Sequence, residues 1–249
     1  MKRIWRIVST RLRKCMSFTN WSFAIHNCLV LLVYGKIKNA YTTMHIDIDF
    51  SQELKQHLDS LDEVKMSNNP SRHKMGNSHS TLKPFAGLYE MMNTYIRYLD
   101  VRKHGVLDQL LTDITPACEE FCGSPFIFVN VAAWKMQPDT PVLERGSCRM
   151  HCDGYAPGHL KCLVYVTALN KDTGLFQIKN EIISSENPGL AVIFQNSDIS
   201  HMAISGKKYE RYTLDITMMR VLKQSDQLRY YSGTCDDRHL ALPHYAYLN

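Results

Sequence analysis

The feature that most constrains the fold is a change of residue pattern near position 124. Beyond it, short runs rich in β-branched and aromatic residues are separated by turn signals such as "NKDTG" and "ENPG". Short runs of this kind at near-even spacing predict the strands of a β-sandwich or barrel. We expect strands within "SPFIFVNVAAWKM", "LKCLVYVTALN", "GLFQI", "GLAVIFQN", "ISHMAI" and "ERYTLDITMMRVL".

The residues before this change favour helices. Apolar residues recur at helical spacing over 50–64, and the stretch 84–103 starts with Pro and is followed by Gly105, as is typical of helix ends. The stretch "GVLDQLLTDITPACEEFCG" continues the helical pattern, whereas the polar segment 66–80 predicts a loop. The sequence therefore predicts an α+β fold, in which a helical part, 46–123, buttresses a jelly-roll core, 124–222.

Residues 1–45 form a basic extension. Eight of the 29 Lys and Arg residues precede the first acidic residue, Asp47, so 21 basic residues accompany the 24 acidic ones after it. The apolar run 21–34 is shorter than the ~20 residues of a membrane span. A signal anchor, an organelle-targeting segment and an extension outside a 46–249 domain all remain open. Membrane contact is expected only if residues 21–34 act as an anchor.

Charge and cysteine content narrow the function classes. The slightly acidic body lacks the clustered basic stripe that nucleic-acid binding requires. The eight cysteines include no CxxC pair, and the two C-x3-C spacings lack the second pair of a zinc finger. We expect reduced thiols in a reducing intracellular compartment. The sequence leaves the oligomeric state and the role of residues 223–249 open.

A candidate metal site lies in the strand-rich half. His151 and Asp153, two apart at a strand start, project to one face, with Cys152 facing away. His201 is the candidate third ligand, since distant strands of a jelly roll lie side by side. Two imidazoles and one carboxylate bind Fe(II) and leave positions open for a 2-oxo acid and dioxygen. Arg211 can bind the far carboxylate of that acid bidentately, helped by the hydroxyl of Thr213.

Residues 125–220 resemble the Fe(II)/2-oxoglutarate-dependent dioxygenases, most of all the phytanoyl-CoA dioxygenase-like group. The matching residues are "HCD" at 151–153, the glycine of "NKDTGLFQI", "PGLAVIF", His201 and "RYT" at 211–213. The resemblance implies a double-stranded β-helix (jelly-roll, cupin-like) core. It implies iron bound by His151, Asp153 and His201, and 2-oxoglutarate bound by Arg211 and Thr213, with Asn130 and Tyr165 as further cosubstrate candidates.

The activity that the resemblance implies is hydroxylation of a small organic or biosynthetic substrate at an unactivated C–H bond, with O2 and 2-oxoglutarate consumed. Tyr155, His159 and Arg149 are candidate substrate contacts. His159 is expected in a loop, on the substrate side or solvated. Lys161 is expected either to bind an acidic substrate group or to be a solvated charge at a strand edge.

Two other classes of protein also fit a His2Asp site. One is a non-catalytic, cupin-like metal-binding barrel, and the other is a zinc hydrolase, since these ligands also hold Zn2+ with an open position. A mere metal-binding barrel has no need of the Arg211 and Thr213 pair. A hydrolase would need a general-base Glu, and the sequence places none near residues 151 or 201.

Overall fold

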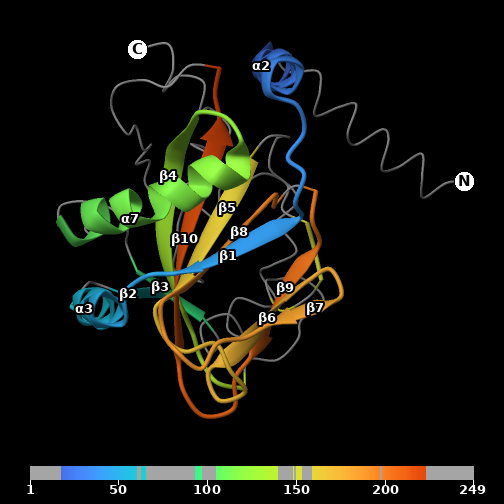
Figure 1. Ribbon diagram of the computed structural model, residues 1–249. Helices are drawn as coiled ribbons and strands as arrows, with labels where there is room; N and C mark the ends of the chain where they lie inside the picture. Colours follow the sequence, from blue (N-terminus) through green and yellow to red (C-terminus); the bar gives the residue numbers. More distant parts are fainter. Residues whose placement is uncertain are drawn as a thin grey trace, which may run out of the picture.

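The computed structural model shows two antiparallel β-sheets with helices packed on the larger one (Figure 1). It describes residues 18–60, 63–65, 93–96, 105–139, 148, 150–152, 159–196 and 198–222. The helices are α2 (Phe18–Tyr34), α3 (Ile48–Asp59) and α7 (Gly105–Cys122). The strands are β1 (Tyr41–His45), β2 (Glu63–Lys65), β3 (Asn93–Ile96), β4 (Phe126–Met136), β5 (His159–Tyr165), β6 (Gly174–Ile178), β7 (Glu181–Ile183), β8 (Leu190–Phe194), β9 (His201–Ser205) and β10 (Arg211–Arg220).

The first five strands belong to the large sheet, and from β5 onward the chain crosses repeatedly between the two sheets. The large sheet has the order β1-β8-β5-β10-β4-β3-β2, and the small sheet has the order β7-β6-β9. Strands that are distant in sequence therefore become neighbours, as β10 does with both β4 and β5. The strands expected from the second half of the sequence are all present.

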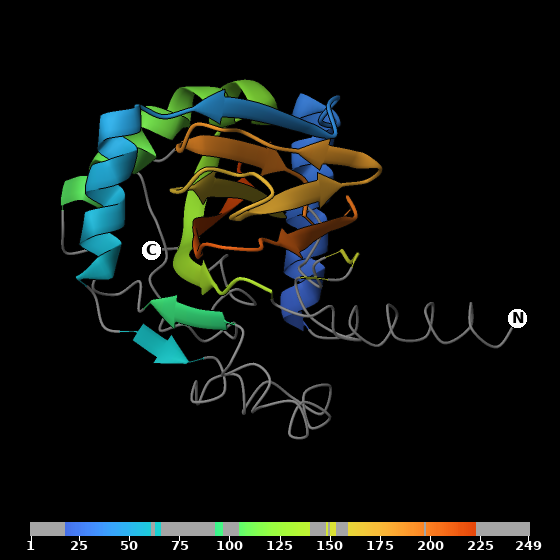
Figure 2. The same ribbon diagram turned by 90° about the horizontal axis from the view of Figure 1, so that it is seen from below.

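Alternating side chains on the large sheet supply two hydrophobic cores. One face packs against α3 and α7, where Leu54, Leu58, Leu110 and Ile114 are fully buried. The other face meets the small sheet in a core that contains Tyr165, Leu190, Val192 and Phe194 from the large sheet, and Phe176 and Ile178 from β6. Figure 2 shows α3 and α7 outside the large sheet, on the side away from β6 and β9. Among the described functional candidates, Tyr165, His201 and Arg211 lie on the inner face, between the sheets.

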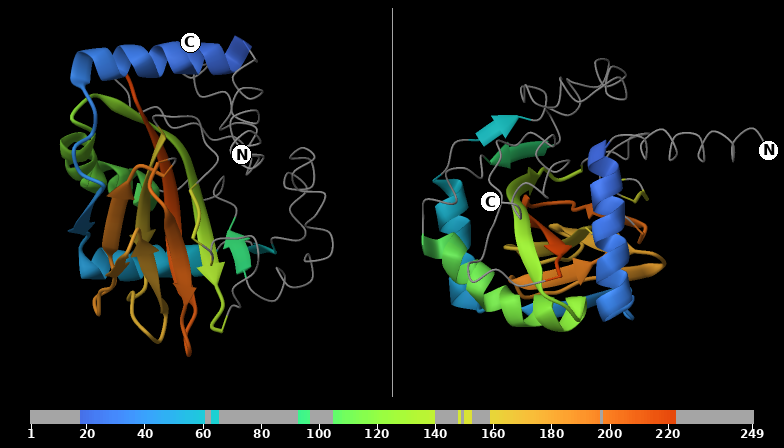
Figure 3. Two further views of the ribbon diagram at one scale, coloured as in Figure 1. Left: turned by 90° about the vertical axis from the view of Figure 1, so that its right-hand side faces the viewer. Right: turned by 90° about the horizontal axis from the view of Figure 1, so that it is seen from above.

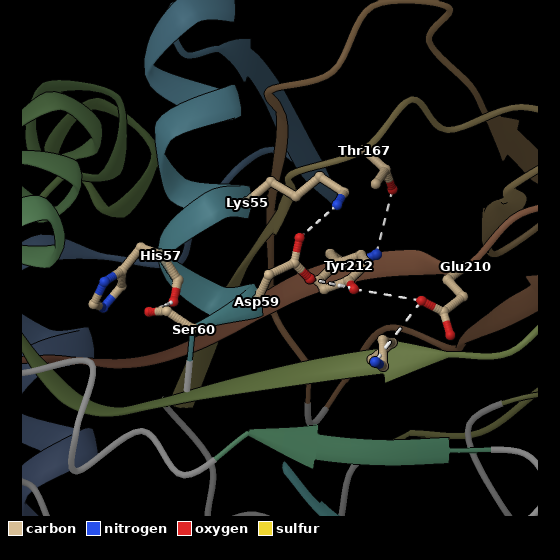
Figure 4. A network of polar contacts seen from close by, with 8 residues as sticks. Lys55, His57, Asp59, Ser60, Thr167, Glu210 and Tyr212 are labelled. Carbon is tan, nitrogen blue, oxygen red and sulfur yellow. Dashed lines mark hydrogen bonds and ion pairs between the residues drawn. The ribbon is translucent and has the colours of Figure 1, made fainter. Parts of the chain in front are cut away.

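Both ends of α3 are attached by polar contacts. The Asp47 carboxylate caps its first turn by accepting hydrogen bonds from the backbone N–H groups of Asp49 and Phe50. The buried Ser51 hydroxyl donates to the carbonyl of Val166, at 2.9 Å. At the last turn, Asp59 accepts hydrogen bonds from Lys55 and from Tyr212 of β10 (Figure 4). These contacts hold α3 against the sheet.

The prediction of helix over 84–103 is wrong for residues 93–96. These residues form β3, which pairs with β4 through contacts such as Tyr95 opposite Trp134. β2 pairs in turn with β3, so the expected helix over 50–64 ends at Asp59 and the helical part 46–123 contains two strands. The unpaired edge of β4 offers backbone donors and acceptors, and this tertiary pairing overrides the local helical pattern. The expected loop over 66–80 lies outside the described residues.

The predicted domain boundary at residue 46 also differs from the structure. Residues Tyr41–His45 form β1, which pairs with β8 from Tyr41 opposite Phe194 to His45 opposite Leu190. Strand β1 therefore belongs to the large sheet and covers an edge that β8 would otherwise expose. Helix α2 precedes β1 and lies across one end of the sheet (Figure 3).

Candidate metal centre

His151 and His201, 50 positions apart in the sequence, lie side by side. Their backbones pair through two hydrogen bonds, from His151 N to His201 O at 3.0 Å and from His201 N to His151 O at 2.8 Å. The centroids of the two imidazole rings are 4.4 Å apart. His151 thus extends the small sheet beyond β9. The two histidines therefore lie side by side in one sheet rather than on opposite sheets, and their joint binding of a metal stays a prediction.

His201 is buried, and its ring is oriented by its neighbours. Its Nδ1 atom donates to the carbonyl oxygen of Ile199, at 2.9 Å. A carbonyl only accepts hydrogen bonds, so Nδ1 carries the proton and Nε2 is the nitrogen that can bind a metal. The rings of Phe194 and Phe176 pack against the imidazole at centroid distances of 4.8 and 5.9 Å. A backbone acceptor on the distal nitrogen is the usual outer contact of a metal-binding histidine.

The carboxylate of the expected ligand set lies outside the described residues, because Asp153 belongs to the segment 153–158. Within the described ranges no group of three or more His, Cys, Asp and Glu side chains forms a metal site. The substrate candidates Tyr155 and Arg149 also lie outside these ranges. The structure therefore describes two of the three expected ligands.

Arg211 begins β10 and is buried between the two sheets. Its Nη1 atom donates to the carbonyl oxygens of Leu175, at 3.0 Å, and Ile204, at 3.2 Å. Its Nη2 atom lies 3.1 Å from Sδ of Met136, a weak acceptor. Its buried Nε atom has no hydrogen-bond partner among the described residues. Burial lowers the pKa of the guanidinium from its ordinary value, because removal from water disfavours the charged form.

Tyr165 and Thr213 lie beside Arg211 on the inner face. Thr213 follows Arg211 by two residues in β10 and is paired directly with Tyr165 of β5. The Arg211 guanidinium carbon lies 5.6 Å from the centroid of the Tyr165 ring. Burial raises the pKa of the Tyr165 phenol, so this group is neutral near pH 7. The three cosubstrate candidates Arg211, Thr213 and Tyr165 are therefore adjacent.

Ring contacts connect the histidine pair with Arg211. The ring of Phe176 lies 5.9 Å from that of His201 and 6.1 Å from that of Tyr165, which in turn faces Arg211. Asn130, the fourth cosubstrate candidate, is a residue of β4 whose backbone pairs with Thr217 of β10. Its side chain is outside what the structure describes.

His159 and Lys161 differ from their predicted environments. His159 is the first residue of β5, paired with Met219, and is fully buried, so it is neither in a loop nor solvated. Lys161 is also buried, and its Nζ atom forms a 2.7 Å ion pair with Asp215 Oδ2. The strand starts earlier than expected because β10 extends to Arg220 and provides partners for these residues.

Sequence reasoning did not select Asp215, which shares the inner face with Arg211 and Thr213 by strand alternation. The available signal was a single acidic residue within the otherwise uncharged stretch "TLDITMM". A buried carboxylate requires a charged or hydrogen-bonding partner. Its partner, Lys161, comes from a strand more than 50 positions away, which is why local pattern could not reveal the pair.

Comparison with solved structures supports the fold. The chain is similar to the non-haem α-ketoglutarate-dependent epimerase SnoN from nogalamycin biosynthesis, with a TM-score of 0.52, 12% identity, and coverage of 78% of this chain and 83% of SnoN. Two further structures are less similar. HygX from Streptomyces hygroscopicus has a TM-score of 0.49 and 12% identity, with coverage of 83% of this chain and 96% of HygX. A prolyl-4-hydroxylase from Pseudomonas putida has a TM-score of 0.45 and 12% identity, with coverage of 80% of this chain and 98% of that enzyme. No protein-family model matches the sequence, and no match is found among curated proteins. At 12% identity, the likeness to SnoN shows a shared fold.

Proposed function

We propose that this chain is a non-haem Fe(II)- and 2-oxoglutarate-dependent dioxygenase that hydroxylates an unactivated C–H bond of a small organic or biosynthetic substrate. One observation carries the proposal. The paired rings of His151 and His201 share the interior of the sandwich with a buried arginine, Arg211, whose Nε atom has no partner among the described residues. A metal-binding group and a carboxylate-binding group in one interior are what this chemistry needs.

The donor set fits iron. His151 and His201 supply two imidazoles, and Asp153 would complete a set of two histidines and one carboxylate. Such a set occupies one face of Fe(II) and leaves positions open for a chelating cosubstrate and O2. The hydrogen bond from His201 Nδ1 to Ile199 O fixes the tautomer in which Nε2 can bind the metal.

The arginine fits the far carboxylate of 2-oxoglutarate. The Nη1 atom of Arg211 is held by two carbonyls, so the guanidinium plane is fixed before any ligand binds. The edge formed by Nε and Nη2 has the geometry that binds a carboxylate bidentately. The hydroxyl of Thr213 can donate a further hydrogen bond, and the phenol of Tyr165 is held neutral beside the guanidinium.

Iron, 2-oxoglutarate and O2, when bound, supply the oxidising chemistry, in which 2-oxoglutarate is converted to succinate and CO2 while the substrate is hydroxylated. The protein residues orient and shield these reactants. Arg211 and Thr213 set the position of the cosubstrate. Phe176 and Phe194 pack on His201 and exclude water from its side of the site.

We assign the fold more narrowly to the double-stranded β-helix. Four strands of the large sheet, β8, β5, β10 and β4, face the small sheet, and the backbone pairing of His151 with His201 adds a fourth position to β7, β6 and β9. Within this class, the sequence pattern around HCD and RYT supports the phytanoyl-CoA dioxygenase-like group. Tyr155, His159 and Arg149 are the proposed substrate contacts.

Anaerobic titration tests the proposal. Purified apo-protein is titrated with Fe(II) and then 2-oxoglutarate while the weak visible charge-transfer band of the ternary complex is followed. The variants are Asp153→Ala, His201→Ala and Arg211→Ala. Arg220→Ala is the matched control, because Arg220 is another buried arginine of β10, but it donates to Ser124 and Gly35 rather than facing the small sheet.

We expect a band that requires both ligands, is lost in Asp153→Ala and His201→Ala, and needs at least tenfold more 2-oxoglutarate in Arg211→Ala, since a charge-assisted hydrogen bond contributes about 1.5–3 kcal/mol. Arg220→Ala should bind 2-oxoglutarate like the wild type. Metal binding without a band in folded protein would overturn the proposal and favour a metal-binding barrel or a zinc hydrolase.

A further inference from the structure

The outward face of α2 carries a continuous row of exposed apolar side chains. Ile25, Leu29, Leu32 and Val33 are 55%, 43%, 82% and 61% exposed, respectively. Their spacing of four, seven and eight residues from Ile25 places them on one side of a helix. Single exposed apolar residues are ordinary on protein surfaces, but a row of four along one helix marks an interaction surface.

The opposite side of α2 is attached to the sandwich. Val30 is fully buried, and the Tyr34 hydroxyl donates to the carbonyl oxygen of Leu222, at 2.8 Å. Just past the helix, Arg220 Nη1 donates to the carbonyl oxygen of Gly35, at 2.9 Å. The helix is therefore fixed across one end of the large sheet (Figures 1 and 3). Its apolar row faces outward, because the four side chains are exposed while Val30 is buried. The side of α2 that packs on the domain is thus a different one from the apolar row.

The charges around α2 identify the partner. The helix has 17 residues and contains no Asp, Glu, Lys or Arg. Six basic and no acidic residues precede it, and Lys36 and Lys38, both exposed, follow it before the first acidic residue, Asp47. An apolar helix face flanked on both sides by positive charge matches a membrane surface, where apolar side chains enter the acyl boundary and basic residues contact anionic headgroups.

No described helix is long and apolar enough to cross a bilayer. A second copy of the chain is a less favourable partner for the row than anionic lipid. A second copy of the chain packed on the same row would bring two basic flanks together, and the like charges would repel each other. Anionic lipid instead provides an apolar layer and complementary charge in one surface.

We propose that α2 binds the surface of anionic phospholipid membranes, lying in the plane of the interface with Ile25, Leu29, Leu32 and Val33 inserted. The contact holds the domain at the membrane surface. It is independent of the proposed dioxygenase activity.

Vesicle co-sedimentation of the full chain tests this inference. Vesicles of phosphatidylcholine alone are compared with vesicles that contain about one third phosphatidylglycerol, at low salt and at high salt. The test variant is Leu29→Gln/Leu32→Gln, in which neutral glutamine avoids adding a charge that anionic lipid would repel. The matched control is Ile182→Gln/Tyr209→Gln, which changes two residues that are 50% and 61% exposed elsewhere on the sandwich.

We expect the wild type to bind anionic vesicles at least tenfold more tightly than neutral ones, and binding to weaken as salt screens the basic flanks. Leu29→Gln/Leu32→Gln should reduce binding at least tenfold, whereas the control pair should bind like the wild type. Lys36→Gln/Lys38→Gln should weaken binding to anionic vesicles and leave the low affinity for neutral ones unchanged.

Two results would overturn the inference. One is a wild-type chain that stays in the supernatant with both vesicle types. The other is a concentration-dependent dimer, measured by light scattering, that Leu29→Gln/Leu32→Gln abolishes while vesicle binding persists, since the row would then be a self-association surface. Because all four substituted side chains in the test and control pairs are exposed, equal thermal unfolding midpoints verify that any loss of binding is not a loss of fold.

Discussion

Nη1 of Arg211 lies 2.9 Å from the point that a Cβ atom on Gly174 would occupy. Gly174 has a φ angle of +114°, and the same Cβ would stand 2.5 Å from the carbonyl oxygen of Ile204, itself a hydrogen-bond acceptor of Arg211. The missing side chain at 174 allows the guanidinium to reach the backbone of β6 and β9. The turn glycine and the arginine, 37 positions apart, are thus one structural unit.

This relationship predicts the effect of Gly174→Ala. The added methyl group requires a positive φ that alanine disfavours and displaces the Arg211 head group, so we expect a loss of about 2 kcal/mol in the free energy of unfolding and a roughly tenfold weaker affinity for 2-oxoglutarate. Urea denaturation and ligand titration measure the two effects. Gly189→Ala is the control, with φ +89° and a Cβ position 2.8 Å from Ile46 O. It should lose stability and retain affinity, and equal affinity in both variants would contradict the link.

The ion pair between Lys161 and Asp215 predicts strong coupling in a double-mutant cycle. Asp215→Leu removes the 2.7 Å contact of the buried Lys161 ammonium, and Lys161→Met removes it from the partly buried Asp215 carboxylate. Either change alone should therefore lower the free energy of unfolding by about 3 kcal/mol. The double variant should recover most of this loss, because no unpaired charge remains. Urea denaturation of the four proteins measures the coupling. A cycle in which the single losses simply add would show that the pair contributes nothing as a pair.

Tyr212→Phe should change how stability depends on pH. Burial opposes ionisation of Asp59, but hydrogen bonds from Lys55 and Tyr212 outweigh it and lower the pKa of this carboxyl. A lowered pKa gives stability that is present above the ordinary carboxyl value, ~4, and is lost as pH falls through the folded-state value. Because Asp59 is partly exposed, we expect Tyr212→Phe to cost only about 0.5–1 kcal/mol at pH 7.

That difference between wild type and Tyr212→Phe should shrink below about pH 4. Urea denaturation at pH 7, 5 and 3 follows it, with Tyr209→Phe as the control at an exposed tyrosine. A difference that grows towards low pH would contradict the role assigned to Asp59.

Thiol accessibility predicts a labelling pattern. The described cysteines are all free, with Cys28 and Cys152 exposed and Cys118, Cys122, Cys148 and Cys162 buried. A hydrogen bond with Cys162, together with burial, raises the pKa of Cys118, and burial raises that of Cys122, so both stay as unreactive thiols. Iodoacetamide at pH 7.5 should modify Cys28 and Cys152 and spare the four buried cysteines in native protein. Peptide mass spectrometry measures this, with urea-unfolded protein as the control.

Much of the strand-rich half could be predicted from local pattern. The alternation and turn residues after position 124 predict β4, β5, β6, β8, β9 and β10, because side-chain period and turn chemistry are properties of short segments. The spacing of His151, His201 and Arg211 singled these residues out as candidates for one site. The structure places the two histidines side by side. Asp153 lies outside the described residues, and its role stays a prediction.

Other features depend on partners that are distant in sequence. Residues 93–96 have a helical context but form β3, because the edge of β4 needs hydrogen-bond partners. Tyr41–His45 join the large sheet for the same reason, beside β8. From the sequence alone Lys161 could be a solvated charge, whereas in the structure it is paired with Asp215.

The sequence by itself determined the strand periods, the candidate metal ligands, the arginine and the uncharged helix with basic flanks, since residue type and short spacing suffice for these. Only the tertiary structure decided which strand edges are paired, which charges are buried, which backbone carbonyls bind Arg211 and which side of α2 is outward. These outcomes depend on desolvation and contact between segments far apart in the chain, and no local pattern encodes them.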